Sequence, residues 1–360
     1  MTRKSKEELR SLGEHFCRTI ADLFECEAVF SSKTTTVIRG RPRVSVESLV
    51  ALANARLNPE GFLVTCDGVG DRYTLSISSG AIGRRFPWLN VVLFVATVAS
   101  VLFTAALHAS GEALFADWSL IWSGIPFTFW LICILLLHEL GHYVYSRLRG
   151  VDVSLPYFIP APYFFILGTL GAVIKSRSPI KNRRDLLDVG AAGPIAGFVV
   201  AVAAIIIGLN QSEVIESAGA SGFQLGDSIL IRLLSYLVIG PIPEGTDIAL
   251  DPIAFAGWVG LLVTMLNLLP VGSLDGGHIV YALAGRRQRL IGMMTIALLF
   301  ALSFWWQGWL IWVGLALFMG PAHPPTLFDE VPLGKGRRII GLLCLIIFIL
   351  CFIPIPFAGI

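Results

Sequence analysis

Charged side chains are scarce in this sequence. Asp, Glu, Lys and Arg account for 14% of the 360 residues, whereas about 25% is usual in soluble proteins. Hydrophobic residues account for 55%, and several runs approach the roughly 20 apolar residues that a bilayer-spanning helix needs. The scarcity of charge excludes an ordinary soluble domain, and a net charge of +2 gives no reason to expect a nucleic-acid partner. We expect a multi-pass integral membrane protein in contact with the lipid bilayer.

Closely spaced cysteine pairs are also absent, and the first residues are unlike a targeting segment. No CxxC pair occurs among the six cysteines, so the sequence predicts neither a disulfide framework nor a cysteine metal site. The amino-terminal stretch contains acidic residues and no apolar core segment, so we expect neither a secretory signal peptide nor a typical transit peptide there. We expect the cysteines to pack as small apolar side chains.

Residues 1–84 differ in kind from the rest of the chain and predict a small soluble α+β module. The expected order is helix, strand, helix and a two-stranded hairpin, over residues 5–24, 27–42, 45–61, 61–67 and 71–78. No catalytic constellation occurs in this module. A regulatory partner and a plain structural role are both open for it.

From residue 85 onward the chain is membrane-like and predicts about six to seven transmembrane helices. The expected spans are 86–108, 121–146, 187–209, 253–283, 290–306, 308–320 and 339–357. Residues 228–240 are apolar but contain Arg232, so we expect an interfacial or re-entrant piece there.

The loops alternate in charge and predict an orientation. Basic residues cluster before residue 86, at 147–149, 175–184, 286–289 and 335–338, whereas the other connections are mainly acidic. Basic loops stay on the cytosolic side of a membrane. The pattern therefore predicts a cytosolic N-terminus, and we expect the prokaryotic plasma membrane as the location.

The sequence HELGH, residues 138–142, follows one of the most apolar runs. Ionisable groups at membrane depth are costly and usually functional. His138 and His142 are four residues apart, so on a helix both imidazoles project from one face and can bind one Zn²⁺. Glu139 lies beside them in the position of a general base.

A second unusual segment is NLLPVGSLDGGHIVYAL, residues 267–283. Pro270 and Gly272 are expected to break the helix, and broken backbone at membrane depth is tolerated where it lines a cavity. Asp275 would complete a His₂Asp ligand set and leave a fourth zinc position open, as in catalytic sites.

These motifs resemble those of the site-2 protease type of intramembrane zinc metalloproteases, the peptidase M50-like family. The resemblance rests on HELGH, on N-x-x-P-x-x-x-x-D-G-G at 267–277, and on the segments 167–198 and 322–330. It implies a protease domain over 85–360 with its catalytic core at about 121–285.

The resemblance also implies site roles. One Zn²⁺ per chain would be bound by His138, His142 and Asp275, with Glu139 as the general base. Asn267 would help to position substrate, and a re-entrant β segment containing Gly168 and Gly171 would pair with it. The implied activity is hydrolysis of peptide bonds in transmembrane protein substrates.

Other functions stay open at this point. A different HExxH protease would use a downstream Glu as its third ligand, and no suitable intramembrane Glu follows His142. A metal or proton transporter would show paired half-helices in two related halves, which the sequence lacks. A non-catalytic scaffold would not need Glu139. The sequence suggests no role for His323 and does not name a substrate.

Overall fold

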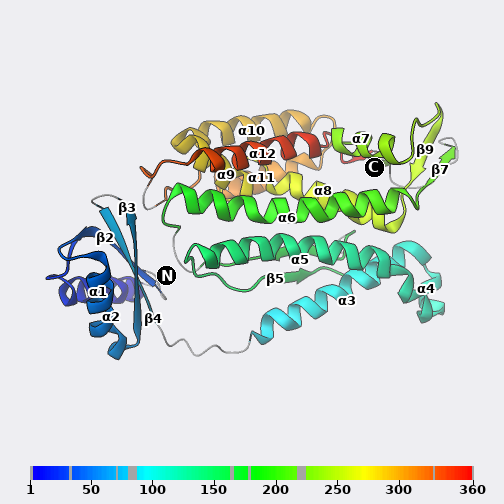
Figure 1. The fold of residues 1–360 in the computed structure, drawn as a ribbon. Coiled ribbons are helices and arrows are strands. Elements are labelled where there is room, and N and C mark those ends of the chain that lie inside the picture. The colour runs from blue at the N-terminus through cyan, green and yellow to red at the C-terminus, as the bar shows by residue number, and fades with distance from the viewer. Residues whose placement is uncertain are drawn as a thin grey trace. The chain divides into compact units, whose positions relative to one another are not determined.

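The computed structural model describes residues 3–31, 35–69, 72–79, 87–162, 166–176, 180–216, 224–326 and 329–358 (Figure 1). Its internal contacts divide the chain into two compact units. One comprises Met1–Pro87, Gly150–Ser154 and Lys175–Pro179, and the other comprises Trp88–Arg149, Leu155–Ile174 and Ile180–Ile360. We describe each unit by itself.

The N-terminal part of the first unit is a four-stranded sheet with two helices. Its elements are α1 (Arg3–Thr19), β1 (Phe24–Ser31), β2 (Thr35–Pro42), α2 (Val46–Leu57), the short 3₁₀ turn η1 (Asn58–Glu60), β3 (Phe62–Val69) and β4 (Arg72–Ser79). The antiparallel strands lie in the order β1-β2-β4-β3. Apolar side chains of both helices and of the sheet form one core, which includes Phe16, Leu49 and Leu75.

The prediction of a single strand over residues 27–42 is wrong. Two strands, β1 and β2, occupy this region and pair antiparallel. Their close approach depends on Gly40, because a Cβ there would collide with the carbonyl oxygen of Glu25. The first helix also ends at Thr19, since residues 20–23 form a turn and Phe24 begins β1.

The second unit is mostly helical. Its longer helices are α3 (Trp88–Ser110), α5 (Ile125–Leu148), α6 (Arg183–Leu209), α8 (Pro252–Asn267), α10 (Gln288–Leu302), α11 (Trp309–Met319) and α12 (Lys335–Cys351). Shorter helical elements are α4 (Ala113–Ala116), η2 (Trp118–Gly124), α7 (Ile229–Val238), α9 (Asp275–Ala284) and η4 (Gly285–Arg287). The short strands are β5 (Tyr157–Pro160), β6 (Thr169–Val173), β7 (Glu213–Glu216), β8 (Gln224–Leu225), β9 (Thr246–Ala249) and β10 (Phe357–Ala358).

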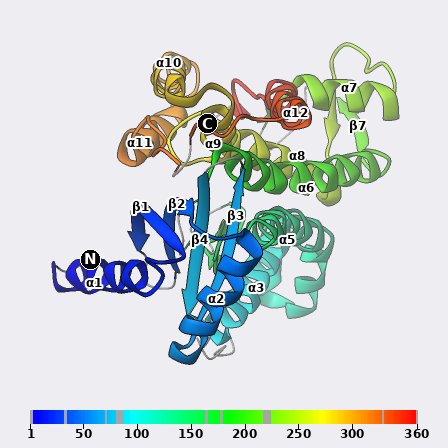
Figure 2. The ribbon, with the colours of Figure 1, turned by 60° about the vertical axis from the view of Figure 1, so that its left-hand side comes forward.

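The helices of this unit are layered. In both views α5 lies between α3 and the pair α6 and α8, and α9 to α12 lie on the far side of that pair (Figures 1 and 2). The apolar core includes Leu131 of α5, Leu187 of α6 and Leu261 of α8. These shared core side chains show that α5 packs directly against α6.

Three helical segments in the described part of the chain are long and apolar enough to cross a membrane. They are Trp88–Ser110, Trp118–Leu148 and Arg183–Leu209. Shorter apolar helices occupy Ile229–Val238, Pro252–Asn267 and Trp309–Met319. The prediction of a helical membrane protein is confirmed at this level.

The expected span over residues 253–283 is divided into two helices. α8 ends at Asn267 and α9 begins at Asp275. The chain turns tightly between them: a Cβ on Gly276 would collide with the carbonyl of Leu268, and one on Gly277 would lie 2.7 Å from the carbonyl oxygen of Val271. The glycines after Asp275 thus permit the break that brings Asp275 to the start of a helix.

Candidate metal centre

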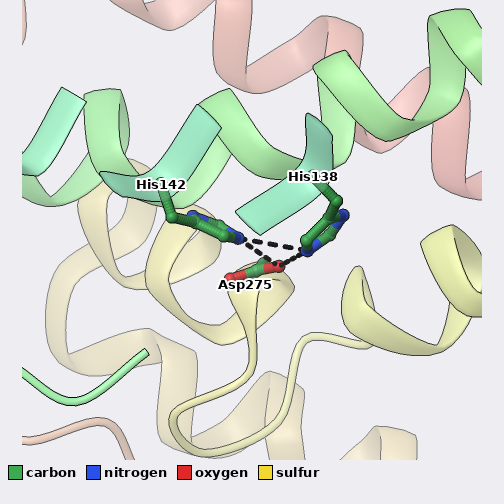
Figure 3. Close-up of side chains that lie close together, drawn as sticks. All are labelled: His138, His142 and Asp275. Carbon is green, nitrogen blue, oxygen red and sulfur yellow. Dashed lines mark hydrogen bonds and ion pairs between the residues drawn. The ribbon is translucent and has the colours of Figure 1, made fainter. Parts of the chain in front are cut away.

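Two imidazoles of the candidate centre come from one face of α5. His138 and His142 are separated by one helical turn, and their Nε2 atoms lie 3.1 Å apart (Figure 3). The side chain of His138 is 6% exposed and that of His142 is 13% exposed. The predicted helix containing HELGH is confirmed, and its two histidines point toward the same place.

The third group is the carboxylate of Asp275, the first residue of α9. Its Oδ2 atom lies 3.2 Å from Nε2 of His142 and 3.4 Å from Nε2 of His138. Figure 3 shows the carboxylate between the two rings. Groups 133 residues apart in the sequence therefore converge on one point.

The donor set fits a zinc ion in chemistry and spacing. Ligand atoms at about 2.0–2.1 Å from a tetrahedral zinc lie roughly 3.3 Å from one another. The three measured separations, 3.1, 3.2 and 3.4 Å, agree with this value. Two imidazoles and one carboxylate are typical protein ligands of a catalytic zinc, which keeps a fourth position open.

A backbone carbonyl fixes the proton of one imidazole. Nδ1 of His142 lies 2.8 Å from the carbonyl oxygen of Val189 on α6. Because a carbonyl can only accept, Nδ1 carries the proton, and in the neutral ring Nε2 is left with its lone pair free. This is the arrangement that orients a metal-binding histidine.

Two glycines of α6 give the imidazoles their space. A Cβ on Gly193 would collide with the ring of His142, and one on Gly197 would lie 3.2 Å from Nδ1 of His138. The sequence motifs do not single out these two glycines or Val189 as part of the site. The segment GPIAG, residues 193–197, predicts a close helix contact, but it does not say which side chains that contact would accommodate.

Glu139 and Asn267 also lie at this centre. Glu139 is half-buried and interacts electrostatically with both His142 and Asp275. The side-chain Nδ2 of Asn267, the last residue of α8, lies 3.3 Å from Nε2 of His138. Five residues singled out from the sequence therefore lie around the same point: His138, Glu139, His142, Asn267 and Asp275.

Gly168 and Gly171 lie on the β5–β6 hairpin instead. Gly168 has a φ of +72°, and its carbonyl oxygen accepts a hydrogen bond from the hydroxyl of Ser100 on α3. Gly171 has a φ of +91°, and a Cβ there would meet nothing within 4 Å. No hydrogen bond or ion pair of the described residues joins these glycines to His138, His142 or Asp275.

His323 contacts the helix that begins with Asp275. Its Nε2 lies 2.7 Å from Nδ1 of His278 on α9, and its backbone N–H donates to the side chain of Gln288. Gln288 in turn donates to the carbonyl of Pro270, in the break between α8 and α9. His323 therefore helps to hold α9 in place, a role that the sequence alone does not indicate.

Part of the chain matches one protein family, and the curated relatives are named probable zinc metalloproteases. Residues 126–303 match the model of peptidase family M50. The chain is 32% identical over 262 residues to the probable zinc metalloprotease EGY2, chloroplastic, of Arabidopsis thaliana, a match that covers 70% of this chain and 46% of the relative.

Two further relatives from Arabidopsis thaliana show the same pattern. The probable zinc metalloprotease EGY1, chloroplastic, is 30% identical over 241 residues, covering 65% of this chain and 43% of the relative. The probable zinc metallopeptidase EGY3, chloroplastic, is 28% identical over 292 residues, covering 72% and 48%.

The chain spans somewhat less than half the length of these relatives, and no solved structure matches it. The family match begins at the start of α5 and ends after α10, so it contains all three residues of the candidate centre. Residues 126–303 therefore form a domain of peptidase family M50, as the sequence motifs suggested.

Proposed function

We propose that this protein is an intramembrane zinc endopeptidase that hydrolyses peptide bonds of transmembrane or membrane-anchored proteins. The observation that carries the proposal is the convergence of His138, His142 and Asp275 from two helices, with Glu139 on the same helix as the histidines. The names of the relatives, zinc metalloproteases, support the same chemistry.

His138, His142 and Asp275 would hold one zinc ion. The ion would supply Lewis-acid chemistry, polarising the scissile carbonyl and lowering the pKa of water. Glu139 accepts the proton of the attacking water and returns it to the leaving amine, the dual task of a general acid–base group. The carbonyl of Val189 keeps His142 in the tautomer that binds metal.

The substrate would be held in an extended form. The peptide groups of a transmembrane helix are hidden in its own hydrogen bonds, so the scissile region has to unwind locally before it can react. β6 is the strand proposed to receive it by main-chain pairing, the mode in which a peptide adds to a sheet. The exposed side chains of Leu170 and Val173 would contact the substrate. Gly168 would anchor the hairpin to α3, Gly171 would keep its edge open, and Asn267 would orient the reacting peptide.

The proposed arrangement in the membrane follows the loop charges. Residues 1–84 form a separate module facing the cytosol, where a regulatory partner would bind, and 85–360 form the protease domain in six to seven spans. The prokaryotic plasma membrane is the proposed location, although the compared relatives carry chloroplastic names.

The decisive experiment replaces Glu139 with Gln. The amide keeps the shape of the side chain but cannot accept the proton, so cleavage of a single-span substrate in detergent should fall by about 10²–10⁴-fold. Zinc content should not change, because Glu139 is not a ligand. Glu112→Gln, at an exposed glutamate next to α4, is the matched control and should keep full activity.

Zinc and folding are measured on the same samples. A transporter or scaffold that used this cluster would show no cleavage in the wild type either. A folded, zinc-loaded Glu139→Gln protein that cleaves at the wild-type rate would remove Glu139 from the mechanism.

A further inference from the structure

A buried carboxylate lies one residue before the carbonyl that holds His142. The side chain of Asp188 on α6 is only 6% exposed. Arg337, near the start of α12, binds both of its oxygens, with Nε 2.9 Å from Oδ1 and Nη2 2.9 Å from Oδ2. Arg149, directly after α5, approaches Oδ2 with Nη2 at 2.5 Å.

These contacts bring three helices together at one end of the helical unit. The end of α5, the start of α6 and the start of α12 lie at the same end in Figure 1. The start of α6 also reaches α9, since the guanidinium of Arg183, the first residue of α6, donates to the carbonyls of Ala282 and Leu283. Each helix that supplies a proposed zinc ligand is thus tied to the first two turns of α6.

We infer that Asp188, held by Arg149 and Arg337, is a positioning residue of the metal centre that acts through the carbonyl of Val189 on His142. The inference rests on the proposed zinc site and extends it to residues outside the ligand set. We call the three side chains the Asp188 clamp.

The physical argument starts from burial. A carboxylate with little access to water needs its cationic partners, and removing one partner leaves an uncompensated charge. The two-pronged contact of Arg337 also fixes direction, because a planar guanidinium binds both carboxylate oxygens in one orientation. The clamp therefore restrains the turn of α6 on which the next residue, Val189, presents its carbonyl to Nδ1 of His142.

The consequence for metal binding follows from that contact. If the turn shifts, the carbonyl of Val189 moves away from Nδ1, and the ring of His142 loses the partner that sets its tautomer and orientation. Loss of such an outer partner typically weakens metal binding by about 10–100-fold. Neither clamp arginine needs to touch the metal or the substrate for this effect.

The test compares Asp188→Asn with Asp185→Asn in the full-length protein. Asp185 lies one turn earlier on α6. Its carboxylate accepts a hydrogen bond from Asn182 and forms a longer ion pair with Arg149, at 3.9 Å from Nε, than Asp188 does at 2.5 Å. We expect Asp188→Asn to weaken zinc affinity by about 10–100-fold. Asp185→Asn removes a buried charge from the same helix and should leave zinc affinity close to that of the wild type.

A spectroscopic readout separates positioning from a general loss of stability. Co²⁺ in place of zinc should give an altered visible absorption spectrum in folded Asp188→Asn protein and an unchanged one in Asp185→Asn. If Asp188→Asn does not fold, Arg337→Lys keeps the positive charge but loses the two-pronged contact, and it should show a smaller shift in the same direction.

The clamp should also behave as one unit. Combining Asp188→Asn with Arg337→Gln should weaken zinc binding no more than the stronger single change, because residues that act through one contact are not additive. If the wild type binds zinc, and Asp188→Asn has the same zinc affinity and the same cobalt spectrum, the inference is wrong but the proposed function stands. A wild type that binds no zinc would overturn the proposed function and the inference with it.

Discussion

Asp275 is the residue that joins two distant parts of the sequence into one centre. Its carboxylate lies between the rings of His138 and His142, and no other group of three or more His, Cys, Asp or Glu side chains in the described residues meets in this way. An anionic ligand also offsets the charge of a dication that two neutral imidazoles cannot offset. Asp275 therefore supplies the one negative charge of the three-residue ligand set.

Replacement of Asp275 by Ala is expected to leave a weak two-histidine site. Zinc per chain, measured by elemental analysis after dialysis, should fall well below one, and cleavage should be lost with it. Asp251→Ala is a suitable control, because this acidic residue caps the start of α8, away from the triad. Undiminished zinc in Asp275→Ala would exclude this carboxylate from the ligand set.

The absence of a side chain at Gly193 also predicts a clear effect of mutation on zinc binding. Because a Cβ at this position would collide with the ring of His142, Gly193→Ala should displace the imidazole and reduce zinc affinity by about tenfold or more, as changes beside a metal ligand do. The measurement is a zinc competition titration with a chelator.

The control for Gly193 is Gly314 on α11, where a Cβ would meet nothing within 4 Å. Gly314→Ala should keep zinc and gain up to about 1 kcal/mol in helix stability. Equal zinc affinity in the two alanine variants would contradict the packing argument.

At this scale the sequence predicts residues whose side chains carry the chemistry. His138, Glu139, His142 and Asp275 have a recognisable spacing, and the structure brings them together. Gly193 contributes by having no side chain, and Val189 contributes a carbonyl that every residue has. Their importance depends on which helices pack together, and a linear pattern does not contain that information.

Among the secondary-structure elements, the helices of the second unit are well predicted by their apolar runs. The strands of the N-terminal module are predicted less well. Pro270 and Gly272 correctly indicated the break between α8 and α9. Residues 27–42 predict one strand, whereas β1 and β2 pair there. Runs of β-branched residues favour a strand but do not mark a reversal, so the hairpin had no strong signal at its centre.

Helix α2 offers a matched pair of leucines for testing the core of the module. Leu49 is fully buried and Leu52 is 44% exposed. Leu49→Ala should destabilise the module by about 2–5 kcal/mol, whereas Leu52→Ala should cost much less, because only the first change leaves a cavity.

Hydrogen exchange of residues 3–79 in the full-length protein measures the difference. Exchange should accelerate across the sheet in Leu49→Ala, and zinc content should stay constant because the two units have separate cores. Equal exchange in the two variants would show that α2 does not pack as described.

For the whole molecule, the loop charges predict which side each connection faces. Gln211, just after α6, is exposed, whereas the hydroxyl of the neighbouring Ser212 is engaged by the backbone of Gly208 and Asp251. In a background without other reactive cysteines, Gln211→Cys should react with an impermeant thiol reagent only from outside the cell. Arg286→Cys, on an expected cytosolic loop, should react only after permeabilisation. The reverse pattern would invert the proposed orientation.

The close approach of α5 and α6 has a mechanical consequence. A Cβ on Gly141 would lie 2.6 Å from the carbonyl oxygen of Ala192, and Gly193 leaves space only for the ring of His142. Helices in backbone contact cannot slide past each other without a collision, so we expect α5 and α6 to move as one rigid body. In the proposed protease, a substrate segment would then reach the metal centre through motion of other elements and not by separation of α5 from α6.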